Sequence, residues 1–146
     1  MIRNIQKNKR YRAIMVNYKP YHRSTKCFYC GDKGDSIDHV PSLYEVYTRG
    51  VDFFLNKNIQ LITVNSCRQC NSVAGTKGHN TDQRAKIIYK RYNKMYQSVL
   101  NNTFWSEEEL DELGFLLRSA IEDKNTIKGW VERRLQYMED IFYDVL

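Results

Sequence analysis

Two Cys-X-X-Cys pairs enclose an Asp-His dipeptide in the first half of the sequence. The cysteines are Cys27, Cys30, Cys67 and Cys70, and Asp38-His39 lies between the pairs. Two such pairs can supply the four thiolates that bind one tetrahedral zinc ion. We therefore predict a structural zinc bound by the four cysteines. The alternatives are two disulfides in an exported protein, or simple buried thiols.

His39 and its neighbours have the composition of a hydrolytic site. Phosphodiester hydrolysis needs an activated water molecule and a positive charge at the phosphate, and a histidine with one divalent cation can supply both. Asp38 precedes His39, and Asn71 directly follows the second cysteine pair. A zinc ion that gathers the four thiolates brings Asp38-His39 towards Asn71. In this hypothesis zinc orders the site and performs no chemistry.

This order of motifs resembles the HNH nucleases, which have the ββα-metal fold. Cys-X-X-Cys, Asp-His, a strand and then Cys-X-X-Cys-Asn is the arrangement of their zinc-containing branch, which includes the phage recombination endonuclease VII family. The similarity runs from about Cys27 to His79, roughly a third of the chain, and includes Gly75.

The resemblance implies a metal-dependent DNA endonuclease that leaves 5′-phosphate and 3′-hydroxyl ends. His39 would be the general base, and Asp38 and Asn71 would bind a catalytic Mg²⁺ or Mn²⁺ ion. His79 would contact the phosphate or complete the metal shell. The alternative for His79 is an exposed histidine in a glycine-rich turn.

Two features depart from the family pattern. Many members have an asparagine in the second strand that orients the catalytic histidine. Here Asn58 and Asn65 both compete for that role, and neither has the usual spacing. Residues 42–58 also form a longer connection than a hairpin needs, which predicts an extra loop or helix beside the site.

The sequence predicts an α+β fold, with a small ββα-metal core stapled by zinc and a mostly helical C-terminal extension. Residues 36–40 and 59–64 have the composition of strands, and a short helix from Asn71 should end at Gly75. We expect a basic arm at 1–26, an HNH-like zinc core at 27–80 and a helical region at 81–146. Lys19-Pro20 disfavours helix and predicts a connector within the arm.

Three helices are expected in the C-terminal region. The first begins at Thr81, runs to about Leu100, and has a basic face available for DNA. That face carries Arg84, Lys86, Lys90, Arg91 and Lys94. Ser106 and Glu109 have the spacing of a capping box, which opens a second helix through about Glu122. Asn125 or Thr126 should start the last helix.

Charge is distributed unevenly along the 146 residues. Residues 1–100 contain 18 Lys and Arg against 6 Asp and Glu, a net charge of +12. Residues 101–146 contain 5 against 11, a net charge of −6. The basic part favours DNA as a partner. The acidic helices either cover the core of the same chain or form a homodimer interface.

The sequence contains no apolar run long enough to span a membrane, and its N-terminus lacks the features of a signal peptide. We therefore expect a cytoplasmic protein of a bacterium or of a phage-infected host cell. Two hypotheses compete with the nuclease. One is a non-catalytic, zinc-stabilised module that binds nucleic acid or a protein partner, and the other is an assembly protein that works through residues 101–146.

Overall fold

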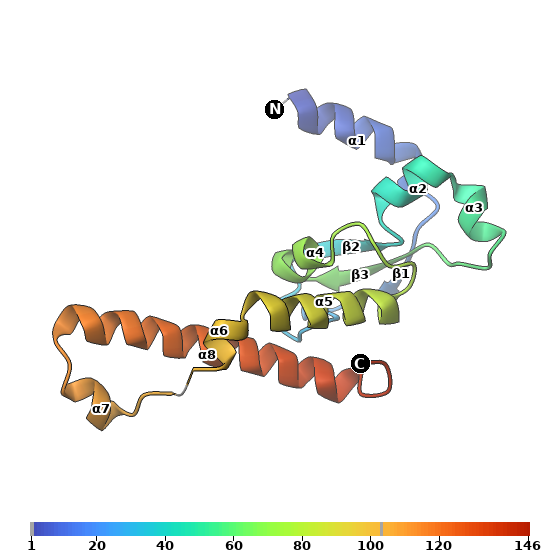
Figure 1. The fold of residues 1–146 in the computed structure, drawn as a ribbon. Helices are drawn as coiled ribbons and strands as arrows, with labels where there is room; N and C mark the ends of the chain where they lie inside the picture. The colour runs from blue at the N-terminus through green and yellow to red at the C-terminus, as the bar shows by residue number, and fades with distance from the viewer. Residues whose placement is uncertain (1, 103) are drawn as a thin grey trace.

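The computed structural model describes residues 2–102 and 104–146. A small sheet lies in the middle of the molecule, with α1, α2 and α3 above it and α5 and α8 below it in Figure 1. Its strands are β1 (Lys19–His22), β2 (Ser36–Val40) and β3 (Ile62–Ser66), in the order β1-β3-β2. β2 runs antiparallel to β3, and β1 runs parallel to it.

β3 leads directly into α4 (Arg68–Ala74), so the chain follows the expected strand–strand–helix order. Cys67 caps this helix, because its Sγ accepts the backbone N–H of Cys70 at 3.3 Å. Gly75 ends the helix as expected, with a φ of 66° that favours glycine. The short helix of the second cysteine pair is therefore closed at both ends by local interactions.

The remaining helices surround this unit. α1 (Ile2–Met15) precedes the sheet, and α2 (Leu43–Arg49) and α3 (Val51–Leu55) form the connection from β2 to β3. The C-terminal helices are α5 (Thr81–Met95), α6 (Gln97–Leu100), α7 (Glu107–Asp111) and α8 (Phe115–Ile141). None of the described helices combines the length and the apolar character that crossing a bilayer requires.

Buried side chains form two cores. The larger core joins the four cysteines and Val64 of β3 to Ile88 of α5 and to Leu135 and Met138 of α8. The smaller core lies between the N-terminal segment and α2 and α3, and it contains Tyr18, Val46, Phe54 and Leu61. The C-terminal half of α8 therefore packs on the cysteine pairs and is part of the same folded unit.

Several predicted elements are confirmed. The strand at 36–40 is present as β2, and the extra loop or helix expected in 42–58 is a pair of short helices, α2 and α3. The capping box of Ser106 and Glu109 is formed. The second strand begins later than expected, at Ile62, because Ile59 packs against the smaller core instead.

The predicted connector at Lys19-Pro20 is wrong. Lys19–His22 forms β1, which pairs with β3. Proline is compatible with this position because β1 is an edge strand, where a missing N–H leaves few ladder bonds unmade. The pairing joins residues more than 40 positions apart, which local sequence patterns do not reveal.

The predicted boundaries of the last two helices are also wrong. α7 ends at Asp111, and α8 starts at Phe115, ahead of both Asn125 and Thr126. The side-chain oxygen and nitrogen of Asn125 bond the backbone of Trp105, and Thr126 donates to the Glu122 carbonyl at 3.0 Å within the helix. These two residues use their polar groups for other contacts and cap no helix.

Candidate metal centre

The four cysteines form one buried cluster. Their Sγ atoms all lie within 4.8 Å of one another, and none of the four is in a disulfide. The Sγ atoms of Cys30 and Cys67 are 3.7 Å apart. Four thiolates around zinc, each about 2.3 Å from the metal, have sulfur atoms about 3.8 Å apart in a regular tetrahedron. The cluster can therefore hold a structural zinc ion.

Local backbone contacts bring the two cysteine pairs together. In the first pair, Gly31 donates its N–H to the Cys27 carbonyl at 3.0 Å and has a φ of 78°. The Phe28 N–H bonds the Asn65 carbonyl at 2.8 Å, which ties this turn to β3. Because Cys67 follows β3 directly, one strand positions both pairs.

The thiols of the cluster hydrogen-bond to one another, and this shifts their acidity. The contact with Cys30 lowers the pKa of Cys27 to about 7. Contacts with Cys27, Cys30 and Cys70 hold the pKa of Cys67 far below its usual range. Contacts within the same cluster raise the pKa values of Cys30 and Cys70, so the four thiols differ in acidity.

Asp38, predicted to bind the catalytic metal, has other partners. It is buried, and Arg84 of α5 binds both its oxygens, with Nη2–Oδ1 and Nε–Oδ2 distances of 2.7 and 2.8 Å. The Tyr29 hydroxyl donates to Oδ2 at 2.6 Å. A divalent cation at Asp38 would have to displace Arg84. The donor set at Asp38 therefore does not fit Mg²⁺ or Mn²⁺ in this conformation.

The prediction that Arg84 lies on a basic face of α5 available for DNA is wrong. Its side chain is buried, and its Nη1 donates to the carbonyls of Lys77 and Gly75 at 2.8 and 3.2 Å. Arg91 is exposed but donates to the carbonyl of Val73 at 2.6 Å. The lysines of that face are exposed and remain available to a polyanion. They are Lys86, Lys90 and Lys94.

His39 follows Asp38 on β2, and its side chain lies on the opposite face of the strand. It is half-buried, and its ring meets the Tyr18 ring edge to face with centroids 5.0 Å apart. Burial lowers the pKa of His39 below its ordinary value, and the charge of Asp38 opposes that shift in part. Burial thus favours the neutral imidazole, which is the form that can accept a proton.

Asn71 lies against β2 as the sequence analysis expected. Its Nδ2 donates to the Ile37 carbonyl at 3.0 Å and to the Ser36 hydroxyl at 3.1 Å. The amide of Asn71 is thus bound to the residue that precedes Asp38-His39. α4 and the Asp-His strand are in direct contact through this side chain.

His79 and the two candidate asparagines are placed elsewhere. His79 Nε2 lies 2.8 Å from Glu45 Oε2 of α2, and its ring packs on Phe54. Asn65 Oδ1 accepts the Ser24 N–H at 3.3 Å, and Asn58 is exposed in the turn after α3. None of the described hydrogen bonds joins these three residues to His39.

The chain was compared with protein-family models, curated proteins and solved structures. None of the three comparisons finds a match. The resemblance to the HNH nucleases thus depends on the residue pattern, and the metal centre depends on its own geometry.

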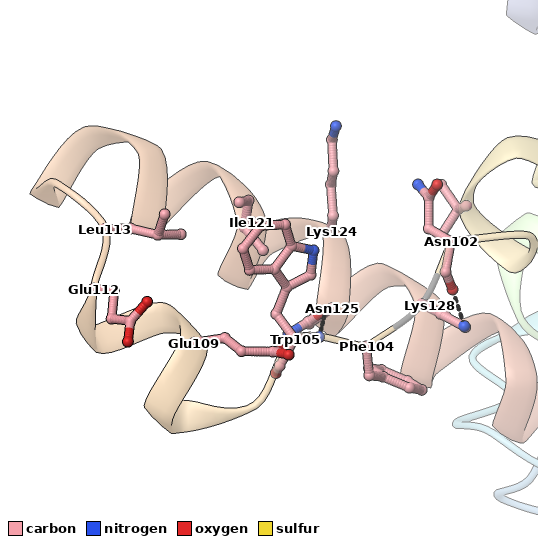
Figure 2. A pocket seen from close by; sticks show the side chains of 11 residues that line it. Asn102, Phe104, Trp105, Glu109, Glu112, Leu113, Ile121, Lys124, Asn125 and Lys128 are labelled. Atoms are coloured by element: carbon pink, nitrogen blue, oxygen red, sulfur yellow. Dashed lines mark hydrogen bonds between the residues drawn. The ribbon is translucent and has the colours of Figure 1, made fainter.

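A cleft of about 660 Å³ lies between α7 and the N-terminal half of α8. Trp105, Leu113 and Ile121 contribute apolar side chains to its lining, and Asn125 and Lys128 also line it (Figure 2). Nearby, Phe115 and Leu116 are 82% and 81% exposed. A homodimer interface, one of the two alternatives given for this region, stays a prediction.

Two buried arginines and two buried tyrosines around the site were not predicted from the sequence as site residues. Arg84 and Tyr29 bind Asp38, and Tyr92 and Arg134 contact the cysteine sulfurs. Tyr92 and Arg134 lie in stretches of sequence with the periodicity of amphipathic helices. This periodicity predicts which positions are buried, but it does not predict which side chains Tyr92 and Arg134 contact.

The zinc assignment predicts the metal content of the protein. We expect about one zinc per chain, and Cys70→Ser should lose most of it because one of four ligands is removed. Metal binding contributes roughly 10 kcal/mol or more to the folding of such sites, so the variant should also unfold at much lower denaturant. Metal analysis and urea titration measure both, with Ser72→Ala as the control on the same helix. Well-folded wild-type protein with far less than one zinc per chain would contradict the assignment.

The Arg84–Asp38 pair predicts a large loss of stability in a single variant. Arg84→Met leaves the buried Asp38 carboxylate without its cation, and removing one partner of a buried pair costs about 3–5 kcal/mol. The exposed neighbour provides the control, since Lys86→Met should change the free energy of unfolding by less than about 0.5 kcal/mol. Urea unfolding compares the two variants. A loss below about 1 kcal/mol for Arg84→Met would show that the pair is not a structural anchor.

Proposed function

We propose that the chain is a zinc-stabilised DNA endonuclease with His39 as the general base. The observation that carries the proposal is the contact of Asn71 with the strand of Asp38-His39. It joins the second cysteine pair to the Asp-His dipeptide, as the HNH pattern implies. The zinc-type cluster beside this contact supports the same function.

His39 has properties that suit a proton acceptor. A general base must be unprotonated when water attacks, and burial of His39 favours its neutral form. The ring keeps partial access to solvent, because the side chain is only half-buried. A water molecule bonded to the imidazole would lose a proton to His39 as its oxygen attacks the phosphorus of a bound phosphodiester. The bond from phosphorus to the 3′-oxygen would break, and the 3′-oxygen would take up a proton from solvent and leave as the 3′-hydroxyl.

The basic surface supports DNA as the substrate. Lys86, Lys90 and Lys94 follow one another at four-residue intervals, so they form a ridge along the exposed side of α5. Such a ridge attracts phosphates and makes binding depend on salt concentration. The acidic residues are concentrated after residue 100, away from this ridge in the sequence.

The HNH resemblance also implies a divalent cation that would polarise the phosphate. Asn71 uses its Nδ2 for the contacts with β2, and its Oδ1 lies outside these bonds. Asp38 fits a cation only after Arg84 withdraws, because both carboxylate oxygens accept from the guanidinium. A role for Mg²⁺ or Mn²⁺ at Asp38 therefore requires the Arg84 side chain to move away from the Asp38 carboxylate.

The buried Asp38–Arg84 pair favours a second candidate function. A carboxylate that is permanently paired with arginine acts as a structural anchor, and the chain would then be a non-catalytic module that binds nucleic acid. The zinc cluster, the ββα order and the lysine ridge serve this function equally well. The two candidates differ in the expected effect of His39→Ala. The substitution should slow DNA cleavage by a nuclease, and it should leave DNA binding by a non-catalytic module unchanged.

The nuclease proposal predicts cleavage of at least one member of a DNA panel. The panel contains linear, nicked, supercoiled and four-way-junction DNA, each incubated with Mg²⁺ or Mn²⁺ and with EDTA. EDTA should suppress cleavage, and His39→Ala should lower its rate by about 100-fold or more, since a general base contributes about 10²–10⁴. His22→Ala, a histidine of β1 packed on Phe28, is the control and should keep the activity.

Two results separate the candidates. Zinc-loaded, folded protein that leaves every DNA intact with either cation would refute the nuclease. If that protein still binds DNA with an affinity that falls as salt rises, and His39→Ala binds equally well, the non-catalytic module is the correct function.

A further inference from the structure

One side chain from α8 reaches the sulfur atoms of the cysteine cluster. Arg134 Nη1 lies 3.1 Å from Cys30 Sγ, 3.2 Å from Cys67 Sγ and 3.8 Å from Cys70 Sγ. It also lies 3.2 Å from the Tyr92 hydroxyl. The contacts connect the end of the chain to both cysteine pairs, across 104 positions in the case of Cys30.

The rest of the Arg134 guanidinium is enclosed as well. Its Nη2 lies 2.8 Å from Asp32 Oδ2, in the loop that follows the first cysteine pair. Its Cζ lies 4.0 Å from the centre of the Trp130 ring, one helical turn earlier. Only 7% of the side chain is exposed. A buried cation is thus held by sulfur atoms, a carboxylate and an aromatic face.

Charge explains why an arginine occupies this position. Four thiolates and one Zn²⁺ carry a net charge of −2, and burying such a charge is costly unless a cation or hydrogen bonds compensate it. Arg134 supplies a positive charge and N–H donors directed at the thiolates, and charge-assisted bonds are stronger than neutral ones.

We propose that Arg134 is an outer-shell residue of the metal centre, and that metal binding and the docking of the C-terminal half of α8 are coupled through it. The proposal requires the structural zinc but not nuclease activity. Because linkage is reciprocal, docking of α8 tightens metal binding by the same factor by which metal stabilises docking. Loss of the metal would remove the ion that holds the sulfur atoms in place around the guanidinium, and this would weaken the attachment of the helix.

The packing of α8 shows which part of the helix is coupled. Val131, Leu135 and Met138 are buried in the core that contains the cysteines. The start of the helix is exposed and projects away from the sheet (Figure 1). Arg134 therefore lies in the middle of the only stretch of α8 whose described side chains pack on the metal centre.

Zinc affinity tests the coupling directly. A chromophoric chelator competes for zinc with wild-type protein, Arg134→Met, Arg134→Lys and Arg133→Met. Arg134→Met should bind zinc about 10–100-fold more weakly, the usual effect of losing an outer-shell partner. Arg134→Lys keeps the charge without the fork of donors and should lose less. Arg133→Met is the control, because the Arg133 side chain is 65% exposed and lies 3.8 Å from Asp32.

Hydrogen exchange on the zinc-loaded proteins gives a second readout. In Arg134→Met the amides of residues 131–141 should exchange at least about tenfold faster than in wild type, whereas those of β2 and β3 should keep their protection. If Arg134→Met does not fold, wild-type protein provides the test. Its α8 amides should lose protection when the chelator removes zinc.

Two outcomes would overturn the proposal. Equal zinc affinities of Arg134→Met and Arg133→Met would show that Arg134 does not support the metal. Unchanged protection of residues 131–141 after zinc removal from wild type would show that docking is independent of it. Both leave the zinc site and the nuclease hypothesis intact. A wild-type protein that binds no zinc would instead refute the metal centre itself.

Discussion

The structure depends on bringing four cysteine sulfurs together from two segments that lie 37 positions apart. The sheet is small, with strands of four or five residues, and a sheet of this size buries little apolar surface on its own. The cysteines are part of the larger core, together with side chains of α5 and α8. A zinc ion in the cluster would cross-link the first turn, the end of β3 and the start of α4. The metal would thus supply stability that the small core lacks.

Two buried arginines extend this organisation by pairing with buried anionic groups. Arg84 links α5 to β2 through Asp38, and Arg134 links α8 to the cysteine sulfurs. Each pair stabilises the fold only while both partners are present, because an isolated buried charge is costly. The C-terminal helices are thus attached by charge as well as by apolar packing. Because Arg84 occupies both oxygens of Asp38, a metal ion can bind this carboxylate only if it displaces the arginine.

The cysteine cluster could be predicted from the sequence because ligand spacing is a local property. Two Cys-X-X-Cys turns that come together place four sulfur atoms where they can bind one metal ion. The capping box of Ser106 and Glu109 could be predicted for the same reason, because its two residues are three positions apart. β1 was missed because its partner is a distant strand, and Pro20 suggests a connector. The partner of Asp38 lies 46 positions away and that of Cys30 lies 104 away, so neither arginine could be assigned before the fold was known.

The most direct test of the metal centre is X-ray absorption at the zinc edge of the purified protein. A structural zinc bound by the four cysteines should show a single shell of four sulfur ligands at about 2.3 Å. A shell that contains nitrogen or oxygen ligands, or protein without zinc that is folded and resistant to urea, would contradict the central claim that four thiolates bind a structural zinc.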